Sequence, residues 1–128
     1  MIAQPNQITQ AMIGAAIEVH RSIGPGLLES AYQQCLVREM SLRGISFERE
    51  RWLALDYKGI HIEKAYRLDF LVAGQVVVEV KSVEALTPID EAQLLTYLRL
   101  GGWQIGLLIN FNVLILKQGI RRKVIGLE

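Results

Sequence analysis

The sequence predicts an α/β fold in which a mixed β-sheet is flanked by helices. Two helical patterns open the 128-residue chain, several strand patterns follow, and a further helical pattern precedes the last strands. This order of elements within one short chain is typical of a single α/β domain. We therefore expect residues 1–128 to form one domain, without an internal repeat or a linker.

Apolar residues at helical spacing predict three helices. The first covers residues 6–22 and ends at the segment IGPG, because proline and glycine favour a tight connection. The second is expected over residues 27–43, where Gly44 can supply a left-handed cap. The third covers residues 87–100 and opens on a Thr-Pro pair, which suits a cap followed by the first helical position.

Alternation of apolar and polar residues predicts the strands. A glycine within the segment YKGIH is suited to a hairpin turn, and a three-residue loop centred on Gly74 joins two further strands. The run WQIGLLINF has the continuous apolar character of a buried strand, and the last segment resembles an edge hairpin. The predicted strand segments are residues 46–57, 65–72, 76–82 and 103–111, with the edge hairpin over residues 113–125.

The overall charge and the single cysteine exclude several classes of protein. A net charge of +1 gives no general electrostatic case for nucleic acid, although local basic patches remain open. Cys35 cannot form an internal disulfide and is expected to be a small buried residue in a reducing compartment. The amino terminus lacks a secretory pattern and no apolar run suits a membrane helix, so we expect a cytoplasmic protein.

Two carboxylates are predicted to face each other across the hairpin centred on Gly74. Symmetric pairing about this glycine places Asp69, five residues before it, opposite Glu79, five residues after it. Like charges directly opposed in a sheet are destabilising, so either one carboxyl is protonated or a cation such as Mg²⁺ lies between them. A solvated sheet face, with ion pairs to Arg67 and Lys81, stays open as the alternative.

Four motifs resemble one group of known proteins, and the resemblance as a whole covers about residues 8–123. The segments RLDF and VVVEVKS resemble the core of PD-(D/E)XK nucleases, although Leu68 stands where the motif has proline. The segment EAQLLTYL resembles the Q-x-x-x-Y motif of RecB-like exonucleases, and GPGLLESAY resembles the signature of the small GxxExxY proteins. The motif positions are Asp69, Glu79-Val80-Lys81, Gln93 with Tyr97, and Gly26 with Glu29 and Tyr32.

This resemblance implies a restriction-endonuclease-like core that hydrolyses phosphodiester bonds with Mg²⁺ or Mn²⁺. The implied metal ligands are Asp69, Glu79, the carbonyl of Val80 and Glu29, where Glu29 binds the ion or a water on it. Lys81 would be the catalytic lysine, and Gln93 and Tyr97 would orient it or contact the substrate backbone. These implied catalytic residues are Glu29, Asp69, Glu79, Lys81, Gln93 and Tyr97.

The expected substrate is nucleic acid, with DNA preferred and a role in repair or defence. Arginines on the predicted strands could contact phosphates: Arg49, Arg51, Arg67, Arg121 and Arg122. The alternative function is a non-catalytic module of the same fold that binds nucleic acid or a protein partner, and a homodimer stays open. Trp52 and Trp103 are expected to pack in a core or interface rather than stack on bases.

Overall fold

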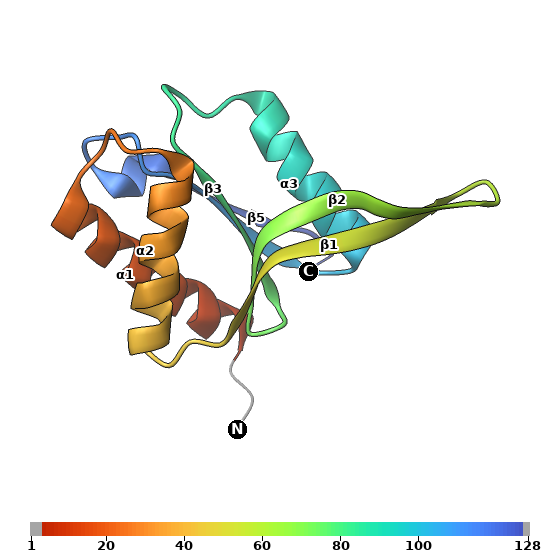
Figure 1. The fold of residues 1–128 in the computed structure, drawn as a ribbon, viewed down its shortest axis with the longest axis horizontal. Coiled ribbons are helices and arrows are strands. Elements are labelled where there is room, and N and C mark those ends of the chain that lie inside the picture. Colours follow the sequence, from red (N-terminus) through yellow and green to blue (C-terminus); the bar gives the residue numbers. More distant parts are fainter. Residues whose placement is uncertain (1–3, 127–128) are drawn as a thin grey trace.

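A five-stranded mixed β-sheet forms the centre of the fold (Figure 1). The structure, a computed structural model, describes residues 4–126 of the chain. The strands lie in the order β1-β2-β3-β4-β5; β3 and β4 run parallel, and the other neighbouring pairs run antiparallel. The predicted mixed sheet flanked by helices is confirmed. In chain order the elements are α1 (Pro5–Ile23), α2 (Glu29–Leu42), β1 (Phe47–Tyr57), β2 (Ile60–Val72), β3 (Val76–Lys81), α3 (Pro88–Gly101), β4 (Ile105–Asn110), η1 (Leu116–Gly119) and β5 (Ile120–Val124).

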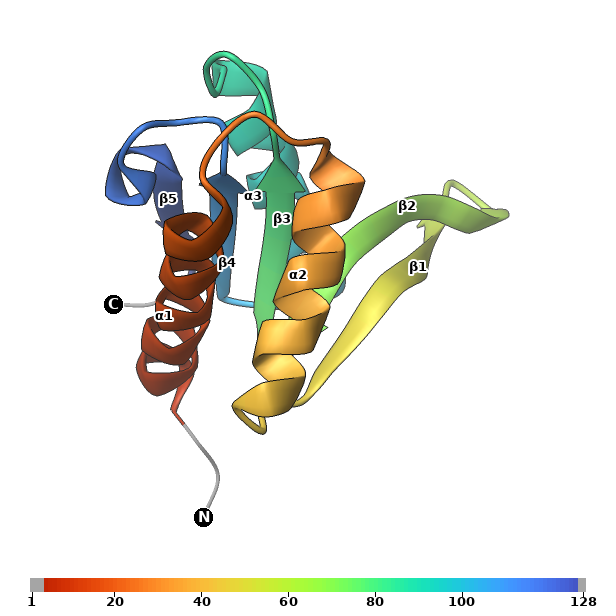
Figure 2. The same cartoon turned by 60° about the vertical axis from the view of Figure 1, so that its left-hand side comes forward.

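The helices form one layer on each face of the sheet. Figure 2 shows α1 and α2 side by side in front of the sheet, with α3 behind it. Val76, Val78 and Val80 of β3 are buried in the core beneath α1 and α2, whereas Val77 is buried in the core beneath α3. Because successive side chains of a strand alternate between faces, Glu79 belongs to the α3 side of the sheet.

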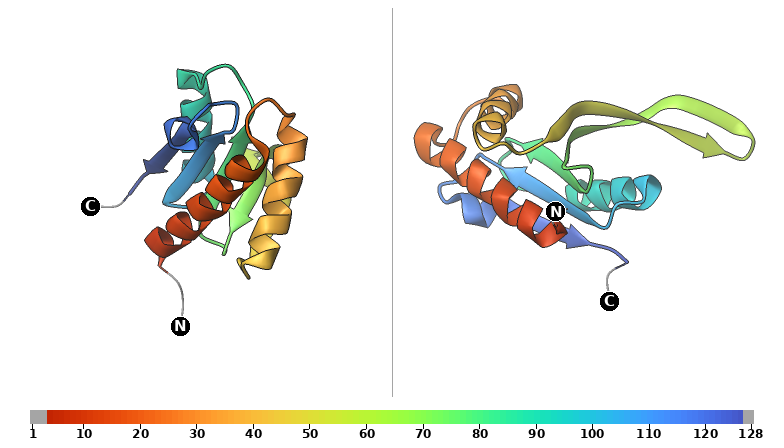
Figure 3. Two further views of the ribbon diagram at one scale, coloured as in Figure 1. Left: turned by 90° about the vertical axis from the view of Figure 1, so that its left-hand side faces the viewer. Right: turned by 90° about the horizontal axis from the view of Figure 1, so that it is seen from below.

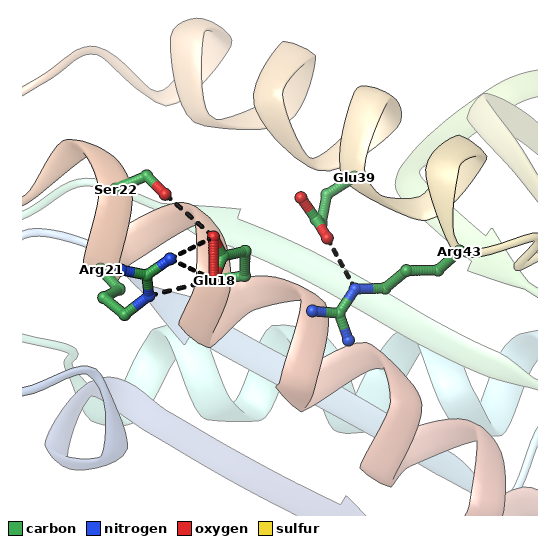
Figure 4. Close-up of polar contacts among 5 residues, drawn as sticks. All are labelled: Glu18, Arg21, Ser22, Glu39 and Arg43. Carbon is green, nitrogen blue, oxygen red and sulfur yellow. Dashed lines mark hydrogen bonds and ion pairs between the residues drawn. The ribbon is translucent and has the colours of Figure 1, made fainter.

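The helix boundaries follow the signals in the sequence to within two residues. α3 begins with the predicted cap, since the Asp90 N–H donates to Thr87 Oγ1 (3.4 Å) and the Thr87 N–H donates to Asp90 Oδ2 (3.0 Å). Figure 4 shows the ion pair Arg21–Glu18 within α1 and the ion pair Arg43–Glu39 within α2, each 2.7 Å long. None of the helices within residues 4–126 is long and apolar enough to cross a membrane.

Tyr32 of α2 is hydrogen-bonded to the short loop that connects α1 and α2. Its buried hydroxyl donates to the carbonyl of Gly24 (2.6 Å) and accepts from the N–H of Leu27 (3.2 Å). Its ring stacks on Phe111, with the ring centroids 4.5 Å apart. The tyrosine of the GxxExxY signature is therefore a core residue in this fold, and it fixes the start of α2 relative to the sheet.

β1 and β2 extend beyond the other strands as a two-stranded arm, defined here as residues 51–68 (Figures 1 and 3). The turn at its tip contains Lys58 (φ 44°) and Gly59 (φ 90°), both left-handed, as a tight two-residue hairpin requires. The left-handed backbone at Gly59 therefore explains why a glycine stands in the predicted hairpin turn. The second predicted strand of this hairpin, over residues 65–72, is longer in the structure and begins at Ile60.

The two-stranded ribbon changes the layer that it packs against at the start of the arm. Phe47 and Phe70 pack in the core beneath α1 and α2, whereas Leu53 and Tyr66 pack in the core beneath α3. Between these pairs lies Glu50, whose φ of 54° is left-handed although the residue is not a glycine. The register is the same on both sides of Glu50, so the ribbon twists there without an inserted residue.

The predicted edge hairpin over residues 113–125 is wrong. Residues 113–115 form no strand, the short 3₁₀ helix η1 follows them, and β5 is the one part of this segment that joins the sheet, where it pairs with β4. The cause is Asn110, whose Oδ1 accepts from the N–H groups of Val83 (3.0 Å) and Asn112 (3.2 Å). Its amide also donates to the carbonyl of Val83 (3.0 Å), and these bonds turn the chain away from β4.

Candidate active site

Asp69 and Glu79 meet where the ladder between β2 and β3 ends. The ladder pairs Phe70 with Val78, Leu71 with Val77 and Val72 with Val76, which is the predicted register. At the next position, hydrogen bonds to the carboxylates of Asp69 and Glu79 take the place of the backbone–backbone bonds of the ladder. The Asp69 N–H donates to Glu79 Oε2 (2.8 Å), and the Val80 N–H donates to Asp69 Oδ2 (2.8 Å). Each carboxylate is therefore fixed by the backbone of the opposite strand.

Burial distinguishes this pair from a solvated sheet face. Glu79 is only 5% exposed, and burial together with the neighbouring Asp69 carboxylate raises its pKa to about 8. Burial also raises the pKa of Asp69, while the bond from the Val80 N–H and the charge of Lys81 act in the opposite direction. The alternative of a solvated face with ion pairs is therefore wrong for these two acids.

Lys81 lies beside the pair and reaches across to α3. Its Nζ lies 3.9 Å from Oδ1 of Asp90, and both side chains are largely buried. The other oxygen of Asp90 belongs to the cap of α3. Asp90 thus connects the lysine to the beginning of the helix, a contact that the sequence analysis missed. The sequence does contain a signal for Asp90: it lies at i, with Gln93 at i+3 and Tyr97 at i+7, so the three residues share one face of the helix.

Tyr97 faces the acid pair from α3. Burial raises the pKa of its hydroxyl, and the charges of Glu79 and Asp69 raise it further, which places the ring within electrostatic range of both. Tyr66 of the arm stacks on Tyr97 with the ring centroids 4.9 Å apart. Gln93, one turn before Tyr97, is exposed to solvent. The predicted Gln-Tyr pair thus shares a helix face, with only the tyrosine packed at the site.

Glu29 does not join Asp69 and Glu79 in a common group of acids. It begins α2, which lies close to the end of β3, since Ser82 Oγ donates to the carbonyl of Leu27 (2.5 Å). Within residues 4–126, however, no three carboxylate, histidine or cysteine side chains gather closely enough to hold one metal ion. A direct role for Glu29 on the same ion would require its side chain to move.

The predicted arginines divide into two groups. Arg49 and Arg67 flank the site, and their side chains lie 3.7 Å and 3.8 Å from the carboxylate of Glu50. The charge of Arg67 also lowers the pKa of both site acids. Arg51 lies over the ring of Trp103 at 5.7 Å and pairs with Glu48.

Arg121 and Arg122 belong to β5, at the opposite edge of the sheet from the arm. With strands about 4.8 Å apart, three spacings place β5 roughly 15 Å from Asp69 on β2, and two spacings place it roughly 10 Å from Glu79 on β3. Arg122 donates to Oδ1 of Asn6, and Arg121 donates to the carbonyl of Gln118. The structure therefore does not bring this pair together with the acids.

The acid pair suits a hard divalent cation. One oxygen of each carboxylate accepts a backbone N–H, and neither Asp69 Oδ1 nor Glu79 Oε1 accepts a hydrogen bond from the described residues. Glu79 is buried and Asp69 is half-buried, and the two carboxylates repel each other while each keeps one oxygen to spare. Such a pair matches the oxygen ligands that Mg²⁺ and Mn²⁺ prefer. Val80 lies directly beside them, so its carbonyl is a candidate third ligand from the protein.

The family of the chain follows from a comparison over nearly its whole length. The profile of the PD-(D/E)XK nuclease superfamily matches residues 6–123. The chain therefore belongs to the PD-(D/E)XK nuclease superfamily, whose nucleases generally use divalent metal ions. No curated protein and no solved structure gives a significant match to the chain.

Proposed function

We propose that this protein is a Mg²⁺-dependent nuclease that hydrolyses phosphodiester bonds in DNA. The observation that carries the proposal is the pair of half-buried Asp69 and buried Glu79 at the end of the β2–β3 ladder, with Lys81 beside it. The order Asp, Glu-x-Lys agrees with the motif after which the superfamily is named. The Gly26, Glu29 and Tyr32 positions further support membership of the GxxExxY group within it.

In this proposal each side chain at the site has a separate task. Asp69, Glu79 and the Val80 carbonyl hold a divalent cation, which when bound would act as a Lewis acid on the scissile phosphate. Lys81 places its ammonium beside the phosphate and stabilises the charge that develops in the transition state. Asp90 limits where the lysine can move, because it holds the ammonium from the first turn of α3.

The helical residues would act on water and on the substrate backbone. Glu29 begins α2 near the end of β3, and in this proposal it binds a water molecule at the site rather than the cation itself. Tyr97 packs beside the acids, and Gln93 is exposed one turn earlier, so Gln93 is the one free to contact a sugar or phosphate. Arg49 and Arg67 flank the acids and would bind neighbouring phosphates once Glu50 releases them.

A cleavage assay tests the proposal. Single-stranded DNA, duplex DNA and RNA are incubated with the protein in Mg²⁺, Mn²⁺ or EDTA. We expect cleavage of DNA only with a divalent cation, and its loss in Asp69→Asn, which keeps the size of the side chain. Glu63→Gln, an exposed change on the arm, is the matched control and should cleave normally. Equal cleavage by Asp69→Asn and wild type would point to a contaminating nuclease.

One observation favours the alternative of a non-catalytic module. Glu29 stands apart from the acid pair, and among the described residues no third acidic side chain lies close enough to Asp69 and Glu79 to hold one metal ion with them. A binding module would retain affinity for nucleic acid or for a protein partner without any metal-dependent cleavage. The same assay, with binding measured on each substrate, separates the two functions.

A further inference from the structure

The arm exposes a tryptophan that the sequence analysis expected to be packed. Trp52 is 48% exposed, and in the register of the arm it lies opposite Arg67. Lys64 Nζ lies 5.5 Å and Arg67 Cζ lies 5.6 Å from the centroid of its ring. An indole that is half open to solvent thus has two cations held against it. Of the two expected positions for Trp52, in a core or in an interface, the core position is wrong.

This tryptophan is continuous with the acid pair. Arg67 precedes Asp69 by two residues on β2, a distance of about 7 Å along a strand. The charge of Arg67 reaches both Asp69 and Glu79 and lowers the pKa of each. A polynucleotide that passes the acids along β2 would therefore meet Arg67 first and the indole next.

We propose that Trp52 is a stacking platform for an unpaired base, so that the site takes a DNA strand that is single-stranded beside the cleavage position. This inference rests on the proposed nuclease function and names its substrate class. An exposed indole stacks on the face of any base, whereas the bases inside a duplex already stack on one another. Lys64 and Arg67 supply the positive charges that the phosphates on either side of the stacked base require.

Fluorescence of Trp52 tests the proposal without any cleavage. Trp103→Phe leaves Trp52 as the only indole, and the protein is titrated with an oligothymidylate or with a blunt duplex of equal length. The titrations are made in EDTA and again with Ca²⁺ in place of Mg²⁺. We expect the oligothymidylate to quench the emission and the duplex to leave it unchanged. If Trp103→Phe does not fold, the difference in emission between wild type and Trp52→Phe gives the same signal.

Binding measurements on the same two probes give the size of the effect. Trp52→Ala should weaken binding of the oligothymidylate by roughly 5- to 150-fold, the range for the loss of one stacked base. Trp52→Phe keeps an aromatic face and should retain most of the affinity. Lys64→Ala should reduce the salt dependence of log Kd by about 1. Leu114→Ala, at an 87% exposed apolar residue far from the arm, is the control and should bind normally.

Two results would overturn the proposal. The first is an oligothymidylate that binds without quenching Trp52, or binds equally well to Trp52→Ala, with and without Ca²⁺. The second is a concentration-dependent dimer that Trp52→Ala abolishes while oligothymidylate binding is unchanged, because the arm would then contact a second copy. Absence of Mg²⁺-dependent cleavage with the quenching intact would refute the nuclease function and leave the stacking platform standing.

Discussion

Replacing Glu79 by glutamine should remove a loss of stability that the wild-type protein shows as the pH rises. The pKa of Glu79 is raised from 4.5 to about 8 by burial and by Asp69. Between these two values the folded state binds more protons than the unfolded state, so the free energy of unfolding falls as the pH rises through this window. At 1.36 kcal/mol per pKa unit, the loss is about 3 kcal/mol at pH 7 and about 5 kcal/mol above pH 8.

Urea unfolding from pH 5 to pH 9, in EDTA to exclude metal ions, measures this effect. Glu79→Gln keeps the volume and an acceptor for the Asp69 N–H, so its free energy of unfolding should exceed that of wild type by a margin that grows with pH. Glu63→Gln on the exposed arm should follow wild type at every pH. If Glu79→Gln also runs parallel to wild type, the carboxylates do not repel each other in the folded protein and the reasoning about the pair fails.

Three further predictions follow from the same contacts. Mg²⁺ binding at pH 7 should release about one proton from the acid pair, seen by calorimetry in buffers of different ionisation enthalpy; the absence of proton release would mean that the pair is already ionised. Asp90→Asn should lower kcat by roughly 10- to 100-fold with little change in KM, because it loosens Lys81, whereas Glu91→Gln, which changes the neighbouring carboxylate paired with Lys123, should leave kcat alone. Tyr32→Phe should cost about 1–3 kcal/mol in urea unfolding by removing the bond to the Gly24 carbonyl; an unchanged midpoint would show that this bond is dispensable.

Local rules were sufficient where a short turn or an alternating strand determined the geometry. The loop centred on Gly74 set the register of β2 on β3, and with it the opposition of Asp69 and Glu79. The valine alternation of β3 predicted one apolar face, which packs beneath α1 and α2, and left open whether Glu79 on the other face was solvated. Glu79 is buried because α3 lies over this face of β3, and the spacing of two charged residues in the sequence does not reveal which helix covers the strand.

The features that were predicted wrongly or not at all share one cause, which is contacts between residues far apart in the sequence. Asn110 ends β4 by bonding to Val83, which is 27 residues away, so the apolar run of residues 113–116 does not enter the sheet. Lys81 pairs with Asp90 because α3 packs back over β3, a contact that no motif spacing encodes. Trp52 is exposed because the β1–β2 ribbon extends beyond the rest of the sheet, whereas its residue type alone favoured a core or interface position.

Turnover and binding of one DNA substrate, compared between wild type and Lys81→Ala, test the central claim most directly. If Lys81 stabilises the transition state, its loss should lower Mg²⁺-dependent cleavage by roughly 10²–10³-fold, while the affinity for the same DNA changes only a few-fold. Arg67→Ala is the matched comparison, because it removes a neighbouring cation and should weaken binding more than turnover. Wild-type protein that binds the DNA but does not cleave it in Mg²⁺ or Mn²⁺, with Lys81→Ala affecting affinity alone, would contradict the claim.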